Sequence, residues 1–136
     1  MDGVAQINLI VSDLERAKAF WLLLGYESTP RHPKAAVLTF PSGMDVVLHE
    51  PDFARLWDPT YEGPHPGSTV IDVNLPSRTA VDEAHERIVA AGFEPSVEPW
   101  DTFFGARYAI VRDQDGNRIG LKSPQDPHLG YPLPEG

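Results

Sequence analysis

The first half of the chain combines short apolar runs with one stretch of helical periodicity. Gln6–Val11 is an apolar-rich run of strand length. Ser12 and Glu15 then have the spacing of a helix capping box, and Gly25 stands in the usual place of a helix C-terminus. The helix between them has one apolar stripe at helical spacing: Leu14, Ala17, Trp21 and Leu24. Three more strands are predicted to follow: one from Tyr26, then Ala35–Phe40 and Asp45–His49, joined by a turn at Pro41–Met44.

The second half repeats the order strand, helix, strand, strand, strand. A strand is predicted at Thr69–Leu75, a helix cap within Thr79–Asp82 and a helix end at Gly92. The stripe of this helix is Val81, Ala84, Ile88 and Ala91. Phe93–Pro95 matches Tyr26–Ser28 of the first half. The sequence therefore predicts an internal duplication.

The second copy closes with a hairpin whose last strand is unusual. Arg107–Val111 and Asn117–Leu121 are the two strands, and Asp115 with Gly116 supplies the tight turn. Gly120 lies in the middle of the last strand, where a glycine weakens the strand and contributes no side chain to packing. Its presence requires an explanation.

These elements predict an α+β fold of two β-α-β-β-β modules. We expect the first module at residues 1–50, a linker with four prolines at 51–67, the second module at 68–123 and a proline-rich C-terminal arm at 124–136 that packs on its own subunit or on a partner. Neither module is expected to bury its sheet well alone. We therefore predict that the modules pair into a curved, partly closed sheet around a cavity.

Composition narrows the class of protein. Apolar residues make up 41% of the chain and charged residues 23%, as in an ordinary globular protein, and no run is long enough for a membrane span. A net charge of -9 argues against nonspecific nucleic-acid binding. It favours a cationic ligand or serves only solubility. The chain has no cysteine, which excludes disulfides and thiolate metal sites, and no secretion signal is apparent, so we expect a cytoplasmic protein.

The paired modules resemble the vicinal oxygen chelate superfamily. The resemblance covers about Ala5 to Ser123 and depends on four segments: Ile10–Ala17 at the helix entry, Gly25-Tyr26, Gly92-Phe93 and Arg112–Asn117. This superfamily includes glyoxalase I, extradiol dioxygenases, fosfomycin-modifying enzymes and bleomycin resistance proteins. The resemblance implies the fold and a dimer, but the scaffold hosts several chemistries and also proteins with none.

The resemblance also implies where a metal ion would bind. Members that use a metal carry His, Glu or Gln at one position in the first and last strand of each module. The corresponding residues here are Gln6, Val47, Val70 and Gly120. Only Gln6 offers a donor atom, so the resemblance implies that this metal site is absent and that no cofactor is needed. Gly120 would then leave room for a bulkier organic ligand.

Strand alternation adds polar candidates to the predicted cavity face: Asn8, His49, Asp72 and Arg118. Several roles stay open for them. Gln6, His49 and Asp72 could form a displaced metal site, or His49 could be a strand-end histidine near solvent. Asp72 could be a catalytic base or a carboxylate bonded to Asn8 or Arg118.

Three aromatic residues are further candidates for ligand contact. Trp100, Phe103 and Phe104 precede the closing hairpin, in a segment that the resemblance implies is a loop at the rim of the cavity. They could stack on a planar ligand or only plug the mouth of the barrel.

The sequence thus predicts a metal-free small-molecule binding protein of the bleomycin-resistance type, which sequesters a drug or metabolite and forms a homodimer. We expect no nucleic-acid or membrane partner and no catalytic or metal-binding residues. The alternative is a glyoxalase- or dioxygenase-like lyase or oxidoreductase with atypical metal ligands. A non-catalytic interaction domain is a third reading.

Overall fold

A computed structural model describes residues 3–133, and the chain divides into two compact units at His65 and Pro66. Each unit contains one four-stranded mixed sheet, and neither sheet is closed into a barrel. The predicted α+β class is therefore confirmed. Among the described residues, none of the helices has the length and apolar character needed to cross a lipid bilayer.

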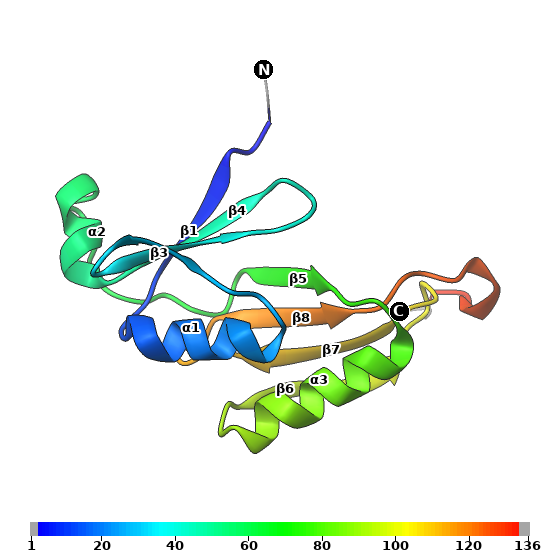
Figure 1. Cartoon of the computed structure of the whole chain (residues 1–136). Coiled ribbons are helices and arrows are strands. Elements are labelled where there is room, and N and C mark those ends of the chain that lie inside the picture. Colours follow the sequence, from blue (N-terminus) through cyan, green and yellow to red (C-terminus); the bar gives the residue numbers. More distant parts are fainter. Residues whose placement is uncertain (1–2, 134–136) are drawn as a thin grey trace. The chain divides into compact units, whose positions relative to one another are not determined.

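The first unit has its strands in the order β1-β4-β3-β2 (Figure 1). Strand β1 is parallel to β4, and the other neighbours are antiparallel. Helix α1 connects β1 to β2 and packs against β4. The elements are β1 (Gln6–Ile10), α1 (Leu14–Leu23), β2 (Thr29–His32), β3 (Ala35–Thr39), β4 (Asp45–His49) and α2 (Pro51–Trp57).

The first helix begins one residue later than the capping box predicted. Asp13, not Ser12, is the N-cap, and its carboxylate accepts a hydrogen bond from the backbone N–H of Arg16 at 3.1 Å. A second free N–H, that of Leu14, donates to the Glu50 carboxylate at 2.9 Å. Two carboxylates therefore satisfy the first turn, a favourable arrangement at the positive end of the helix dipole.

The second unit repeats the topology with the order β5-β8-β7-β6. Strand β5 is parallel to β8, as β1 is to β4, which confirms the duplication. Helix α3 packs against β6, β7 and β8. The elements are β5 (Val70–Asn74), α3 (Arg78–Ala90), β6 (Pro95–Asp101), β7 (Arg107–Arg112), β8 (Arg118–Lys122) and the short 3-10 helix η1 (Pro127–Leu129).

Two local predictions are wrong, and the expected linker has more regular structure than its prolines suggest. The cap of α3 is Ser77, which accepts from the Ala80 N–H at 3.1 Å, and not a residue of Thr79–Asp82. The expected linker contains α2, whose start suits Pro51 because the first helical position needs no N–H donor. The segment with Trp100, expected to be a loop, is strand β6. The last three residues of the predicted arm, 134–136, lie outside the described residues.

Candidate functional site

Strand register defines two sets of candidate side chains, one in each unit. In the first unit, Gln6 pairs with Asp45, Asn8 with Val47 and Ile10 with His49, so these six side chains share one face, here called the Val47 face. In the second unit, the strands pair in the same way, and one face carries Val70, Asp72, Asn74, Trp100, Tyr108, Ile110, Arg112, Arg118, Gly120 and Lys122. We call this set the Gly120 face.

A chain of hydrogen bonds joins three of the predicted residues on the Val47 face. Gln6 Nε2 donates to Asn8 Oδ1 at 2.9 Å, and His49 Nε2 lies 2.9 Å from the same oxygen. Because Asn8 Oδ1 is an acceptor, His49 must carry its proton on Nε2. Nδ1 is then an unprotonated acceptor, and it is buried without a hydrogen-bond partner among residues 3–133.

The surroundings of His49 keep its imidazole neutral. Burial, and then the positive charge of Arg31, lower the pKa of His49 below its usual value. Phe53 of α2 stacks on the imidazole at 5.7 Å between ring centroids, and Trp57 meets it edge-on at 5.0 Å. His49 is only 7% exposed, so the expectation of a strand-end histidine near solvent is wrong. The sequence analysis missed Phe53, which lies in the first turn of α2, directly after the strand that ends at His49.

The Gly120 face explains the glycine in the last strand. Tyr108 Oη donates to Asp72 Oδ1 at 2.6 Å across the backbone of β8. A Cβ at Gly120 would lie 2.0 Å from Asp72 Oδ1 and 2.4 Å from Tyr108 Oη. No side chain can occupy position 120 while this hydrogen bond exists, so the missing side chain of Gly120 makes room for the other two.

Tyr108 is the main residue that sequence reasoning missed. It lies on β7 two residues before Ile110, the partner of Gly120, so an aromatic side chain stands diagonally across from a strand glycine. That pairing is the signal that could have identified it. Burial, and then the hydrogen bond with Asp72, raise the pKa of Tyr108 well above its usual range. Tyr108 therefore acts as a hydrogen-bond donor and not as a phenolate base.

The observed partners of Asp72 and Arg118 differ from the expected ones. Asp72 bonds to Tyr108, and not to Asn8 or Arg118. The Arg118 guanidinium donates to the carbonyl of Gly67 at 3.4 Å. Since Tyr108 fixes one carboxylate oxygen, the Asp72 carboxylate is oriented by its neighbour.

Aromatic side chains border the Gly120 face at β6 and at the turn that follows it. Trp100 pairs with Tyr108 across the strands and is 41% exposed. Phe104 meets the Tyr108 ring edge-on at 6.2 Å, and Phe103 meets Phe104 at 5.2 Å. Trp100 and Phe104 therefore lie next to Tyr108, whose hydroxyl is bonded to Asp72. Phe103 contacts Phe104.

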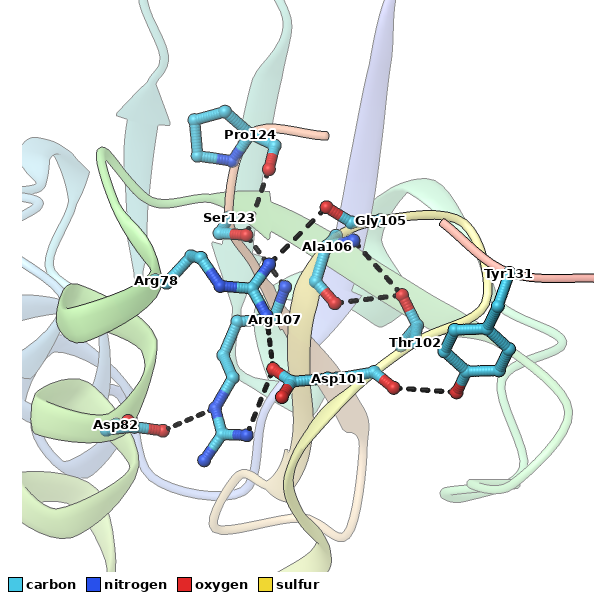
Figure 2. A network of polar contacts seen from close by, with 10 residues as sticks. All are labelled: Arg78, Asp82, Asp101, Thr102, Gly105, Ala106, Arg107, Ser123, Pro124 and Tyr131. Carbon is cyan, nitrogen blue, oxygen red and sulfur yellow. Dashed lines mark hydrogen bonds and ion pairs between the residues drawn. The ribbon is translucent and has the colours of Figure 1, made fainter. Parts of the chain in front are cut away.

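Figure 2 shows the polar network that fixes the turn after β6. The Asp101 carboxylate accepts from both Arg78 and Arg107, and Arg107 also bonds to Asp82 of α3 at 2.9 Å. These contacts place α3 on the side of the sheet opposite the Gly120 face, because neighbouring residues of a strand point to opposite sides. The ion pairs of this unit thus gather on its helix side.

The C-terminal arm holds the same turn from outside. Tyr131 donates through its hydroxyl to the Asp101 carbonyl at 2.7 Å (Figure 2). Its backbone N–H donates to the Phe103 carbonyl at 2.9 Å. Gly105 has a φ of +82°, and a Cβ there would lie 2.1 Å from the carbonyl oxygen of Asp126. The described part of the arm therefore packs on its own unit. This is one of the two arrangements that the sequence analysis expected.

The residues at the implied metal positions do not fit a metal ion. Val47 and Val70 offer hydrocarbon, and at Gly120 the space for a side chain is filled by Asp72 and Tyr108. Within each unit, over residues 3–133, no three His, Asp or Glu side chains gather as metal ligands would. Gln6 and His49 are bridged by Asn8 in one unit and Asp72 lies in the other, so the displaced site stays a prediction.

Comparisons with known proteins agree with this architecture. A family model described as the glyoxalase/bleomycin resistance protein/dioxygenase superfamily matches residues 3–121. A glyoxalase-related enzyme from Fulvimarina pelagi is 23% identical, with a TM-score of 0.81 over 91% of this chain and 89% of that one. No curated protein sequence matches the chain significantly.

Two solved structures of differing function are similar to it as well. Lactoylglutathione lyase from Agrobacterium tumefaciens is 18% identical, with a TM-score of 0.66 over 90% of this chain and 94% of that one. A genomically encoded fosfomycin resistance protein from Listeria monocytogenes is 24% identical, with a TM-score of 0.69 over 92% and 95%. At these identities the likeness shows the fold alone. The family match spans most of the sequence, and the chain therefore belongs to the glyoxalase/bleomycin resistance protein/dioxygenase superfamily.

Proposed function

We propose that the chain is a small-molecule binding protein of the bleomycin-resistance type, which holds an organic ligand without a metal ion and so keeps a drug or metabolite from its target. The observation that carries this proposal is the occupied space over Gly120. Where the resemblance implies a metal ligand, the Tyr108 hydroxyl and the Asp72 carboxylate fill the position of the side chain. A metal ligand at position 120 and this hydrogen bond exclude each other.

The groups on the Gly120 face suit recognition of an organic molecule. Asp72 presents an oriented acceptor, and the indole of Trp100 is partly exposed on the same face. Binding sites for small molecules combine such apolar surfaces with a few fixed polar groups. In this mechanism, stacking and hydrogen bonds hold the ligand, and no bond is made or broken. As part of the proposal, the protein acts as a homodimer, which its mass in gel filtration would test.

The test combines metal analysis with ligand screening. Protein purified without chelator is examined for bound metal by elemental analysis, and its unfolding temperature is measured against a library of drugs and metabolites, with and without EDTA. We expect no stoichiometric metal and a set of ligands that raise the unfolding temperature equally in both conditions, because a ligand that binds only the folded state stabilises it. Stabilisation that disappears with EDTA, or one bound transition metal per chain, would contradict the proposal.

His49 favours a second candidate function, an enzyme that removes a proton from its ligand. The imidazole is neutral, Asn8 orients it through Nε2, and Nδ1 is a buried acceptor without a hydrogen-bond partner in the part of the chain that the structure describes. A general base needs an orienting partner of this kind. The test is to incubate each ligand found above with the protein and follow its mass and structure by chromatography and mass spectrometry. Conversion that His49→Gln abolishes, with binding retained, would establish the enzyme; unchanged ligands would support sequestration.

A further inference from the structure

Two cations of the Gly120 face, Arg118 and Lys122, have no carboxylate partner within residues 66–133. Lys122 and Arg118 lie on β8 at either side of Gly120, two residues away in each direction. Lys122 Nζ contacts Oε1 of Gln125 at 3.3 Å, and Arg118 Nη1 contacts the Gly67 carbonyl at 3.4 Å. Both partners are neutral, and in residues 3–133 neither cation forms an ion pair with a carboxylate.

The opposite side of the same sheet is different. Arg78 and Arg107 both form ion pairs with Asp101, and Arg107 also pairs with Asp82. Carboxylates therefore neutralise Arg78 and Arg107 on the helix side, whereas Arg118 and Lys122 on the Gly120 face form no ion pair in the described part of the unit. The only carboxylate in the set of residues that defines this face is Asp72. The surface potential at this face is thus less negative than the net charge of -9 suggests.

Register places one of these cations in line with the exposed Trp100 and the half-buried Tyr108. Asn74 pairs with Lys122, Lys122 with Tyr108 and Tyr108 with Trp100, so four side chains form one row across β5, β8, β7 and β6. Neighbouring strands lie about 4.8 Å apart, so Lys122 and Trp100 are separated by about 10 Å. An amide and an ammonium group therefore stand at one end of the row, and a phenol and an indole at the other.

The C-terminal arm holds the ammonium group near the aromatic end. Gln125 contacts Lys122 through Oε1 and donates through Nε2 to the carbonyl of Phe104 at 3.2 Å. The ring of Phe104 in turn contacts Tyr108. The long Lys122 side chain is thereby tied to the aromatic turn by two exposed hydrogen bonds, which hold its charge close to the aromatic side chains.

We propose that the row Asn74–Lys122–Tyr108–Trp100 is a subsite for a planar aromatic acid, with the ring on Trp100 and Tyr108 and the anionic group at Lys122. This inference deepens the proposed function and depends on it. The proposed ligand is therefore an anion and not the cation that the net charge favours. The charge at the site, and not that of the whole chain, decides which ligand is bound. Salt screens the distant acidic groups, whereas a contact at Lys122 is screened much less.

The experiment titrates the intact chain with two probes of one shape and opposite charge, naphthalene-2-carboxylate and naphthalen-2-ylmethylammonium. The readout is the indole N–H signal of Trp100 in a nitrogen–proton correlation spectrum, assigned with Trp100→Phe; the buried Trp21 serves as an internal reference. We expect the acid to shift the Trp100 signal saturably and to bind about tenfold more tightly than the ammonium probe, because one partly exposed charge contact is gained and one repulsion is avoided.

Matched variants identify the charge responsible. Lys122→Gln should reduce the preference for the acid to about twofold, whereas Lys18→Gln, which changes the net charge equally but lies on α1, should leave it unchanged. Trp100→Leu, which lacks the indole signal and is followed through the backbone N–H signal of Tyr108, should weaken both probes alike. Unfolding temperatures of all variants show that each is folded.

The outcomes separate the subsite from the proposed function. Tighter binding of the ammonium probe, no shift of Trp100 with either probe, or a preference that survives Lys122→Gln would overturn the subsite and leave metal-free binding standing. A requirement for added metal in the binding of the acid would instead overturn the proposed function.

Discussion

Replacing Gly120 with alanine tests the central geometric claim about the second unit. The added Cβ would lie 2.0 Å from Asp72 Oδ1, 2.4 Å from Tyr108 Oη and 3.0 Å from the ring carbon that bears this hydroxyl. The first two distances are too short for non-bonded atoms and the third is tight, so at least one of the two side chains must move. Both are side-chain ends that can rotate, so we expect the hydrogen bond to break while the backbone of β8 stays in place.

The magnitude follows from two opposing contributions. Loss of a hydrogen bond to a charged group costs about 1.5–3 kcal/mol. Alanine in place of a strand glycine gives back about 0.5–1 kcal/mol, because glycine loses more backbone entropy on folding. The net destabilisation should be about 1–2 kcal/mol, and the lower end is favoured because Asp72 is exposed to solvent.

A double-mutant cycle isolates the contact from the other effects of the alanine. Tyr108→Phe removes only the hydroxyl, so in that background the added methyl group no longer breaks a hydrogen bond. We expect Gly120→Ala to cost about 1 kcal/mol less in the Tyr108→Phe protein than in the parent. The assay is urea unfolding followed by circular dichroism. Equal costs in both backgrounds, or a Gly120→Ala protein as stable as the parent, would refute the explanation of this glycine.

Two further predictions concern His49 and the C-terminal arm. Because the pKa of folded His49 is below its unfolded value of 6.5, the unfolded chain binds this proton more readily. Stability from His49 should thus be complete above pH 6.5 and decline as the pH falls through the folded pKa. Unfolding temperatures from pH 8 to 5 should show a shallower decline in His49→Gln and an unchanged one in His128→Gln; equal slopes in all three proteins would disprove it. Gly105→Ala combines a φ of +82° with a clash against the Asp126 carbonyl, whereas Gly116→Ala combines a φ of +81° with a contact of 3.5 Å to a proline side chain. Gly105→Ala should therefore speed amide hydrogen exchange in the arm at least about tenfold more than Gly116→Ala does. This factor corresponds to a difference of about 1.4 kcal/mol in the free energy of local opening. Similar exchange rates in both variants would show that the arm is not held at Gly105.

Much of the fold could be predicted from the spacing of apolar residues and from the glycines that end helices. Apolar stripes at helical spacing located α1 and α3, and Gly25 and Gly92, both with positive φ, end them as expected. The helix caps were harder, because several neighbouring residues could serve as caps and only the backbone decides which one is extended. A strand was expected to start near Phe93–Pro95, but the extent of β6 to Asp101 was not predicted, because two prolines interrupt its pattern; it lies at the sheet edge, where proline is tolerated.

The candidate site was predictable only in part. Strand alternation correctly grouped Gln6, Asn8 and His49, since a period of two is a property of the chain itself. The stacking of Phe53 on His49 and the hydrogen bond from Tyr108 to Asp72 depend on which strands and helices pack together. Residues 36 positions apart, as Tyr108 and Asp72 are, come together through sheet register, and no local pattern encodes it.

By itself, the sequence determined the duplication, the order of the elements, and the absence of donor atoms at positions 47, 70 and 120. The tertiary structure alone decided what Gly120 is for. A missing side chain has no chemistry that a sequence can display, and only the folded sheet shows that two side chains from neighbouring strands fill the space it leaves.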